Sequence, residues 1–470
     1  MIRMDVRHEV NIPVEITTKE IRGRSFKAML RDFDLYGAEL KDRLDIPDNF
    51  HADVKVVLPD GAIMVESRVD VKENGEMRLK FLNMEPEARR RLWNHLKKKV
   101  EETGCCPYCK SSLRPRQERC GTCGLFVDVE NERYLEISHN DLISLRVVML
   151  EEAVDLFNRE MDEIERFYAS RRGDERELVK EVTAAIHRVC DVCRDLEDIA
   201  GVRSDLVKQK QKWLRKKTDP HFSMSYFCNH ARTWPRGYPG DFEILEGIYR
   251  NVPLSSGMGY LLDLFFLNTT LAVAVKERLA TLREMLRGEL VKRDRPSVLD
   301  IACGSCREVF ELTPEIGASG AEFTCLDFDS DSLSFSSDRL SYTMIHGQIS
   351  FRKYNAIRMV NHERNVREFG YQDIVYSTGL FDYLTDDVLV KMIRALYDLT
   401  NPGGKMISSF KDCNMYKTQI YHWFADWDAF YQRTEKDCLQ LFKEADIPMD
   451  ELSIVRERSG VIMFFVVEKK

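Results

Sequence analysis

Cysteine, glycine and aspartate residues with the spacing of a binding site occur in the stretch VLDIACGSCREVFEL, residues 298–312. Cys303 and Cys306 are separated by two residues, as in a zinc or redox pair, and thiolates are good ligands for zinc. The same stretch places apolar residues before Asp300 and a short polar turn at Gly304, as in a loop that binds a nucleotide. These two interpretations predict different chemistry.

The surrounding pattern favours the loop. A structural zinc site would need two ligands besides Cys303 and Cys306, and no second pair lies nearby in the sequence, although a distant pair stays open. A hydrophobic strand that ends at Asp300, a turn at Gly304 and a helix from about Arg307 would let the backbone approach a ligand closely. The two thiols then become small residues inside the loop.

Polar residues also follow the later strands of this region. Asp327 ends a second predicted strand 27 residues after Asp300, and a carboxylate there can accept hydrogen bonds from both hydroxyls of a ribose. Residues 377–383, STGLFDY, follow a third strand, and residues 401–404, NPGG, introduce a fourth. Because ligands bind at the carboxyl ends of such strands, we expect these segments to lie together.

These residues need a doubly wound α/β sheet to position them. From about residue 295 the sequence alternates β and α patterns. DDVLVKMIRALYDL (386–399) is an expected helix. The expected strands are PSVLDIAC (296–303), EFTCLDF (322–328), YQDIVYST (371–378), GGKMISSF (403–410) and GVIMFFVVEK (460–469).

The ordered set resembles the class I S-adenosylmethionine-dependent methyltransferases. The resemblance implies a Rossmann-like methyltransferase domain over residues 291–470, with S-adenosylmethionine as cofactor. LDIACGSC stands where the family's glycine-rich first motif lies, although Ala302 and Cys306 occupy positions that are often Gly. CLDFDSDSL implies that Asp327 holds the ribose, and FRKYNAIR implies that Asn355 touches adenine. The predicted cofactor-binding residues are Asp300, Ala302, Gly304, Asp327, Phe328, Asn355 and Ser377.

A narrower resemblance covers roughly residues 220–470 and is carried by RGYPGDFEILEGIY, ACGSCREV, GLFDYL and DWDAFYQR. These stretches look like the bacterial methyltransferases of 3-hydroxypalmitic acid methyl ester biosynthesis. The resemblance implies O-methylation of a carboxylate in a small acidic or lipid-like substrate, which is ionised at pH 7 and needs orientation rather than a strong base. Three aromatic residues would either line the substrate pocket or pack in the hydrophobic core: Trp423, Trp427 and Tyr431. The predicted catalytic residues are Arg433, Tyr238 and Tyr383, with Asp241 as an orienting group.

Residues 1–100 contain six short, mostly alternating stretches separated by turns, followed by a helix at 85–100, which predicts a small β-barrel. This part resembles a PilZ domain, the bacterial receptor for cyclic di-GMP. The family's Arg-x-x-x-Arg motif corresponds to Arg3 and Arg7, whose guanidinium groups can pair with phosphate and stack on guanine.

The second PilZ motif corresponds to DFDLYG, from Asp32 to Gly37, with Asp34 in place of the motif's Ser. A carboxylate cannot donate the hydroxyl hydrogen bond, and it adds negative charge near a dianionic ligand. We therefore expect weak cyclic di-GMP binding or none. The candidate contacts are Arg3, Arg7, Asp32 and Gly37.

Two CxxC pairs separated by ten residues lie within residues 104–127. Tetrahedral zinc takes four soft ligands, and each pair supplies two of them from one tight turn, so the pattern predicts a structural zinc ribbon. A redox pair is the alternative. For Cys190 and Cys193, core packing in a helix is favoured over a second metal site. The predicted zinc ligands are Cys106, Cys109, Cys120 and Cys123.

Residues 135–290 have apolar residues at helical spacing, which predicts an α-helical linker or bundle, with a dimer-forming coiled coil as the alternative. The chain has 470 residues and a net charge of −8, so we expect several domains and no DNA binding. Without a run of about 18 apolar residues or a signal peptide, the sequence predicts a cytoplasmic protein with no transmembrane segment. Besides a small-molecule methyltransferase, a non-catalytic signalling adaptor and a protein methyltransferase stay open.

Overall fold

The computed structural model describes residues 8–18, 25–33, 37–47, 50–71, 76–105, 112, 139–170, 174–202, 204–427 and 429–470. The chain forms two compact units. Unit 1 comprises Met1–Phe157 and Arg188–Lys210, and unit 2 comprises Asn158–His187 and Gln211–Lys470.

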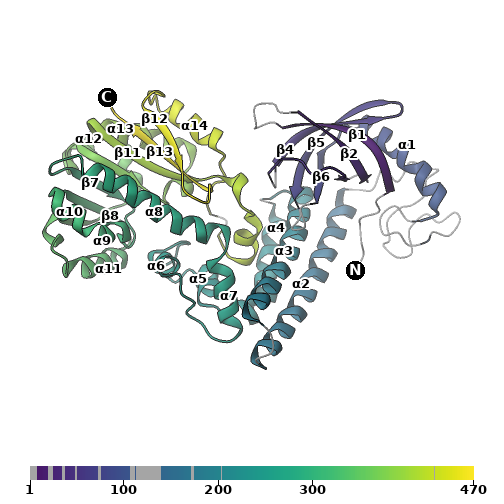
Figure 1. Ribbon diagram of the computed structural model, residues 1–470, viewed down its shortest axis with the longest axis horizontal. Helices are drawn as coiled ribbons and strands as arrows, with labels where there is room; N and C mark the ends of the chain where they lie inside the picture. Colours follow the sequence, from purple (N-terminus) through teal and green to yellow (C-terminus); the bar gives the residue numbers. More distant parts are fainter. Residues whose placement is uncertain are drawn as a thin grey trace. The chain divides into compact units, whose positions relative to one another are not determined.

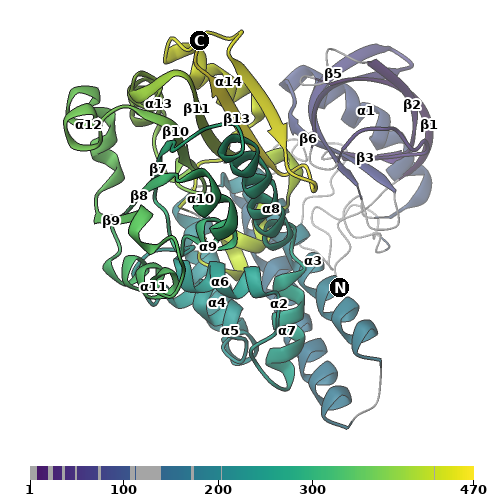
Figure 2. The ribbon, with the colours of Figure 1, turned by 60° about the vertical axis from the view of Figure 1, so that its left-hand side comes forward.

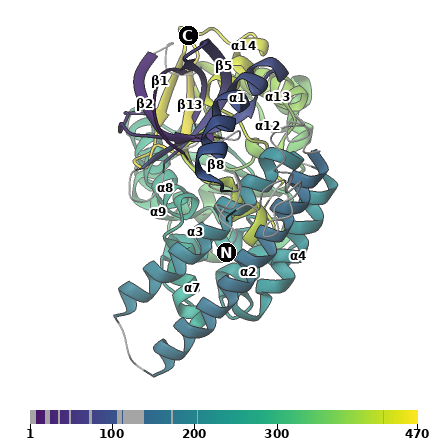
Figure 3. The ribbon, with the colours of Figure 1, turned by 90° about the vertical axis from the view of Figure 1, so that its right-hand side faces the viewer.

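Six strands of unit 1 close a barrel in the order β1-β2-β3-β6-β5-β4 (Figure 1). Along β4 every second residue is buried, which is the period expected of a strand with one face toward a core. Helix α1 (Pro86–Thr103) contacts β5 (Figure 3). Its Leu92 is buried in the barrel core. The predicted barrel with a closing helix is confirmed. The strands are β1 (His8–Thr18), β2 (Ser25–Phe33), β3 (Gly37–Leu40), β4 (Phe50–Leu58), β5 (Gly61–Val71) and β6 (Met77–Asn83).

Gly37 of the predicted cyclic di-GMP motif has a packing role in the barrel. It begins β3, where a Cβ would lie 2.4 Å from the carbonyl oxygen of Leu79 in β6, so no larger residue fits without a backbone shift. Asp32 lies on β2 and is paired in the sheet with Glu39 of β3. Three residues of that motif prediction and all four predicted ribbon ligands lie outside the described residues: Arg3, Arg7, Asp34, Cys106, Cys109, Cys120 and Cys123.

A buried network of ion pairs joins the barrel to helices within unit 1. Arg68 of β5 donates to both carboxylate oxygens of Asp198 at 2.6 and 2.9 Å and to Asp70 at 2.8 Å. Lys80 of β6 contacts Asp195 and lies 3.1 Å from Asp198. Arg146 and Arg194 add cations at 2.9 Å from Asp195 and 3.1 Å from Asp70. Each of the three carboxylates therefore contacts at least two cations.

The described residues between 139 and 290 form seven helices with short connections, as predicted. Cys190 and Cys193 are buried in α3, where burial raises the pKa of the Cys193 thiol. The helices are α2 (His139–Ala169), α3 (Glu175–Ala200), α4 (Asp205–Phe222), α5 (Tyr226–Thr233), α6 (Phe242–Arg250), α7 (Met258–Leu267) and α8 (Thr270–Leu290).

No single helix of the described segments is long and apolar enough to cross a membrane. The pair α7 and α8, bent by 54°, meets the criteria of length and composition when taken together.

Unit 2 contains a seven-stranded sheet in the order β12-β13-β11-β10-β7-β8-β9 (Figure 2). Five neighbouring strands, from β11 to β9, are parallel, whereas β13 runs antiparallel to β11 and to β12. The five predicted strands are confirmed, and β9 and β12 are additional. The strands are β7 (Ser297–Ile301), β8 (Glu322–Asp327), β9 (Ile349–Lys353), β10 (Gln372–Ser377), β11 (Thr400–Lys411), β12 (Leu452–Arg456) and β13 (Ile462–Glu468).

Helices cover both faces of this sheet. Helix α8 contacts α9, α10 and β13, and α11 contacts β8 and β9, whereas α13 contacts α12, α14 and β10. Buried side chains of α13 and α14 pack on those of the central strands, such as Leu299 and Val375. The predicted helix at 386–399 is confirmed. The remaining helices are α9 (Arg307–Glu311), α10 (Thr313–Ser319), α11 (Ser330–Ser341), α12 (His362–Phe369), α13 (Asp386–Leu399) and α14 (Glu435–Glu444).

The connectivity places a switch point beside β7. From β7 the chain continues to its neighbour β8 and then to β9, and it returns to β10 and β11 on the other side of β7. The connections therefore leave β7 and β10 in opposite directions. Ligands of open α/β sheets bind outside the carboxyl ends of the strands at such a point. The fold thus brings the predicted loop to the expected place.

Candidate functional site

The loop between β7 and α9 has three residues in the left-handed backbone region. Ala302, Gly304 and Cys306 have φ angles of 60°, 55° and 46°. Only glycine adopts this region without steric cost, which for other residues is about 1–2 kcal/mol. Ala302 and Cys306, the two departures from the commonest motif, therefore retain the backbone shape that glycine would favour, and the surrounding contacts must hold it.

Those contacts come from β8 and α11. The Gly304 amide donates to Asp327 Oδ2 at 2.8 Å, which fastens the loop to the end of β8. The hydroxyls of Ser332 and Ser336 on α11 both donate to the Gly304 carbonyl oxygen, at 2.6 and 2.9 Å. The Cys303 amide donates to the Leu326 carbonyl at 3.0 Å. The loop is thereby fixed on two sides.

Asp327 is the best-placed predicted residue. Asp327 is the last residue of β8, and it is 7% exposed. Its carboxylate also accepts a hydrogen bond from the Asp329 amide at 3.0 Å. Burial raises the pKa of this carboxyl group, and the two amide hydrogen bonds oppose that rise. It forms no ion pair with any residue in the described ranges. A partly buried carboxylate that is held by amides and lacks a cation is suited to accept ligand hydroxyls.

Phe328 and Tyr238 meet beside Asp327. Phe328 is 54% exposed, and its ring centroid lies 5.0 Å from that of Tyr238. The Tyr238 hydroxyl donates to Asp329 Oδ2 at 2.9 Å, and burial raises the pKa of this phenol. The segment before α6, which carries one of the motifs singled out in the sequence, therefore reaches the carboxyl end of β8.

The other predicted cofactor residues differ in exposure. Asn355 is exposed after β9 and accepts from the Ile357 amide at 3.0 Å. Ser377 is buried, and its hydroxyl donates to the Ile301 carbonyl at 2.8 Å, which ties the ends of β10 and β7 together. Asp300 on β7 is 2% exposed, so its carboxylate lies in the interior beneath the loop.

Asp241 and Tyr383 hold a second loop against the site. Asp241 is buried, caps α6 by accepting from two amides, and lies 2.7 Å from His230 Nε2. A Cβ on Gly240 would lie 3.2 Å from the Tyr383 hydroxyl, so that hydroxyl faces the Gly240 backbone. Burial raises the pKa of Tyr383, so its hydroxyl is a donor at neutral pH and stays one well above it. Tyr238, Asp241 and Tyr383 are thus brought into one neighbourhood by this loop.

Arg433 contacts the turn that carries Tyr383, but its donors are occupied by partners within the protein. It is 4% exposed, and its guanidinium donates to Asp386 and to the carbonyls of Phe381 and Leu384 at 2.6–3.3 Å. These contacts fix the turn that carries Tyr383. Trp423 and Trp427 are buried, and Tyr431 is half-buried.

Sequence reasoning missed Arg278 of α8. Arg278 is 6% exposed, donates to the Tyr249 hydroxyl at 3.2 Å and forms no ion pair within the described part of the chain. A Cβ on Gly379 would lie 2.7 Å from its Nη1, so the guanidinium lies at the segment that follows β10. The signal was available, because Arg278 continues the buried stripe of Leu271 and Val275.

A cavity of about 460 Å³ lies near the Tyr238 loop. Its lining combines aromatic rings, such as Tyr226, Phe242 and Phe335, with charged groups that include Arg236 and Glu243. Arg236 closes one side by pairing with Glu243 at 2.5 Å. None of the predicted cofactor-binding residues lines this cavity, so it is a neighbouring space and not the loop's own site.

An open doubly wound sheet with a positive-φ loop and a carboxylate at its switch point defines an α/β protein of the Rossmann-like class. Residues 298–404, from β7 into β11, match the family model described as a methyltransferase domain. The chain therefore contains a methyltransferase domain, and the prediction of a methyltransferase is confirmed. No curated protein matches the sequence at a significant level.

Solved structures show weaker likeness. A possible exported protein from Bordetella parapertussis is 17% identical over 64% of this chain and 98% of its own, with a TM-score of 0.45. Magnesium protoporphyrin IX methyltransferase from Synechocystis is 15% identical over 43% of this chain and 86% of its own, with a TM-score of 0.33. N-methyltransferase NodS from Bradyrhizobium japonicum is 12% identical over 41% of this chain and 97% of its own, with a TM-score of 0.29. Likenesses at this level define no substrate.

Proposed function

We propose that the protein is an S-adenosylmethionine-dependent methyltransferase that methylates a carboxylate of a small, lipid-like acid. The matched methyltransferase domain and the loop at the switch point support the cofactor. S-adenosylmethionine supplies an electrophilic methyl group. Asp327, a carboxylate without a cation partner among the described residues, would hold the ribose. The exposed Phe328 and Asn355 would flank the adenine.

The main support for an acidic methyl acceptor is that Arg278 is buried without an ion pair to the described residues. A guanidinium that is buried and forms no ion pair with the described residues pays a desolvation cost that an anionic ligand would offset. It lies at Gly379, directly after β10, and its charge acts on Tyr383. An ionised carboxylate needs no general base, only groups that orient it. Arg278 and the Tyr383 hydroxyl supply a cation and a donor for that purpose.

Two of the residues predicted as catalytic become positioning residues in this proposal. Arg433 fixes the turn Phe381–Tyr383 through main-chain carbonyls and Asp386. Asp241 caps α6 and so holds the Gly240 loop against Tyr383. Neither group needs to touch the acceptor to affect its orientation, because a small displacement of a reacting group is costly in rate.

The test is the variant Arg278→Gln, assayed with a 3-hydroxy fatty acid as acceptor. Loss of a charged hydrogen bond should raise KM for the acid by about 10–150-fold, with an unchanged Kd for S-adenosylmethionine. Arg287→Gln, at a half-buried arginine of the same helix that already pairs with Glu284 and Glu315, is the control and should change neither constant. A rise confined to the Kd for S-adenosylmethionine would assign Arg278 to the cofactor and remove the support for an acidic acceptor.

The proposal includes the PilZ-like barrel as a regulatory module whose ligand, cyclic di-GMP, is bound only weakly by the wild-type chain. The closed six-stranded barrel supports it, since it fits the resemblance on which the prediction was made. Asp34 opposes tight binding.

A further inference from the structure

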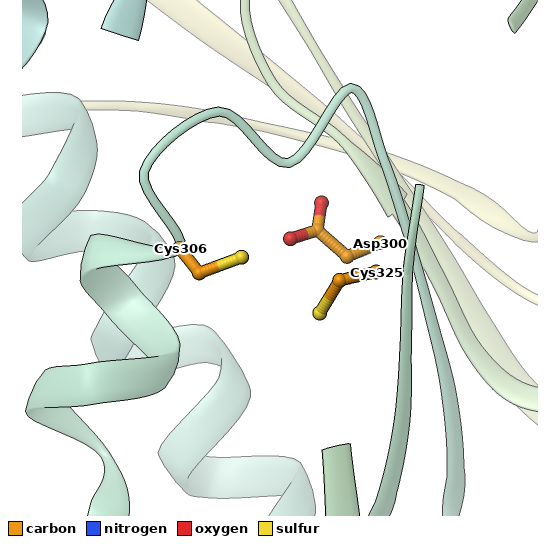
Figure 4. A group of neighbouring side chains, drawn as sticks. All are labelled: Asp300, Cys306 and Cys325. Atoms are coloured by element: carbon orange, nitrogen blue, oxygen red, sulfur yellow. The ribbon is translucent and has the colours of Figure 1, made fainter. Parts of the chain in front are cut away.

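Three potential metal ligands converge beneath the loop (Figure 4). Asp300 on β7 and Cys325 on β8 are register partners in the parallel sheet, so their side chains leave it on the same face. Cys306 reaches the same place from the end of the loop. The ligand atoms of all three residues lie within 4.8 Å of one another.

Asp300 forms no ion pair with a described residue, whereas the charge of Arg339 acts on Cys306. Cys306 and Cys325 are fully buried, and Asp300 is 2% exposed. Asp300 Oδ2 is buried without a hydrogen-bond partner in the described ranges, although the Asp300 side chain also hydrogen-bonds Tyr376 and Glu308. Leaving a buried carboxylate oxygen unpaired is costly, and a cation at this point would remove the cost.

The backbone at Cys306 also favours a role for its side chain. Its φ of 46° is a conformation in which glycine would be cheaper, and the sulfur it carries is fully buried against Asp300 and Cys325. Strained residues persist where their surroundings require them. The thiol hydrogen-bonds the side chains of Cys303, Cys325 and Ser336, and a bound ion would give it a further role.

A fourth donor is present. The Cys303 thiol is hydrogen-bonded to both Cys306 and Cys325. Three sulfurs and one carboxylate oxygen form a donor set typical of tetrahedral zinc. With zinc–sulfur bonds of about 2.3 Å, sulfurs in such a site lie about 3.7 Å apart, so Asp300, Cys306 and Cys325 need to approach one another by about 1 Å at most. The Cys303 sulfur is not among the atoms that lie within 4.8 Å of one another, so its side chain must move farther to join them.

We propose that Asp300, Cys306 and Cys325, with Cys303 as the fourth ligand, bind one zinc ion that ties the loop to β7 and β8. Zinc needs two ligands besides Cys303 and Cys306, and Asp300 and Cys325 supply them. Cys325 lies 19 residues after Cys306 in the sequence and is brought to the pair by the pairing of β7 with β8. The proposal does not rest on the identity of the methyl acceptor. Its consequence is mechanical, because the ion fixes both ends of the segment that contains Gly304.

The test measures zinc per chain in the full-length protein. The double variant Cys106→Ser/Cys120→Ser removes one ligand from each predicted ribbon pair, and after dialysis against a weak chelator it should retain about one zinc per chain. X-ray absorption of this variant should show zinc–sulfur distances of about 2.3 Å. Adding Cys325→Ser should remove the remaining zinc, whereas Cys438→Ser, at a buried thiol of α14, should not. A zinc-free double variant that unfolds cooperatively would overturn the proposal.

A second comparison covers the case in which the double variant does not fold. In the otherwise unchanged chain, Cys325→Ser and the nearly isosteric Asp300→Asn should each contain one zinc fewer than Cys438→Ser. Equal zinc contents in these three proteins would likewise contradict the site.

Discussion

The ion-pair network of unit 1 and the loop of unit 2 bury acidic side chains in opposite ways, although elsewhere in unit 2 buried carboxylates such as Glu246 and Asp382 are paired with cations. In unit 1, Asp70, Asp195 and Asp198 are each neutralised by arginine or lysine side chains that are themselves buried. In unit 2, Asp300 and Asp327 lie near the loop without an ion pair to any described residue. The first arrangement is complete within the protein. The second is incomplete, which is the condition expected where a ligand or ion supplies the missing partner.

The same contrast holds for the cations. Arg68 and Lys80 of unit 1 have carboxylate partners, whereas Arg278 of unit 2, equally buried, has none in the described chain. Burial by itself therefore does not distinguish a structural charge from a functional one. The presence or absence of a counter-charge does, and substitutions in the two units should have different consequences.

The largest effect is expected in unit 1. Arg68→Ala would leave Asp70 and Asp198 with fewer cations in the interior and should lower the free energy of unfolding by about 3–5 kcal/mol. Denaturant unfolding followed by hydrogen exchange of the barrel strands measures this loss. Lys180→Ala, which breaks an exposed ion pair, is the control and should have no measurable effect. Equal stability of both variants would show that the network is not structural.

In unit 2 the loss should appear in binding. Asp327→Ala should weaken S-adenosylmethionine by about 1–3 kcal/mol, or about 5–150-fold, because a charged hydrogen-bond acceptor is lost. Calorimetry measures the change, and Glu322→Ala at the exposed start of the same strand is the control. An unchanged Kd would remove Asp327 from the site.

Stability of unit 1 should depend on pH through Lys80. Burial lowers the pKa of Lys80 to about 7 from an ordinary value of 10.5, so between these pH values the unfolded chain binds more protons. The free energy of unfolding should then rise with pH by up to about 1.4 kcal/mol per pH unit. Below pH 7, Lys80 is protonated in both states and should contribute no pH dependence. Denaturation at pH 7 and pH 9 tests the slope. Lys80→Met should abolish it, and an equal slope in that variant would assign it to another group.

The smallest effect concerns whether unit 1 also binds a ligand. Wild type should bind cyclic di-GMP weakly or not at all, and Asp34→Ser should strengthen binding several-fold because it restores a donor and removes a charge. Arg7→Ala should abolish any binding. Titration of the three proteins tests this, and tight binding by wild type would show that Asp34 does not oppose the ligand. Absence of binding in all three would leave the barrel a structural module.

Local patterns predicted much of the fold. The five apolar strands of unit 2 and the six of the barrel are visible in the sequence because each has a continuous or alternating buried face. Strands β9 and β12 were missed, since each is an edge strand with mostly exposed residues, such as ISFRK in β9. Their place in the sheet depends on neighbours far away in the chain.

The site was predictable to the extent that it is local. The loop around Gly304 and the carboxylate of Asp327 follow directly from strand ends, and they meet as expected at 2.8 Å. The grouping of Cys325 with Cys306 was not predictable, because strand register decides it. The sequence also could not show that the Arg433 guanidinium donates its hydrogen bonds to main-chain carbonyl groups.

The most direct test of the central claim is transfer of a labelled methyl group. The purified protein is incubated with S-adenosylmethionine labelled in the methyl group and with fractionated bacterial extract. The account predicts label in an organic-phase product, released as volatile methanol by mild base, because a methyl ester is base-labile. Label that stays in protein, or in a base-stable product, would contradict carboxylate methylation of a small acid, and absence of any transfer would contradict the enzyme itself.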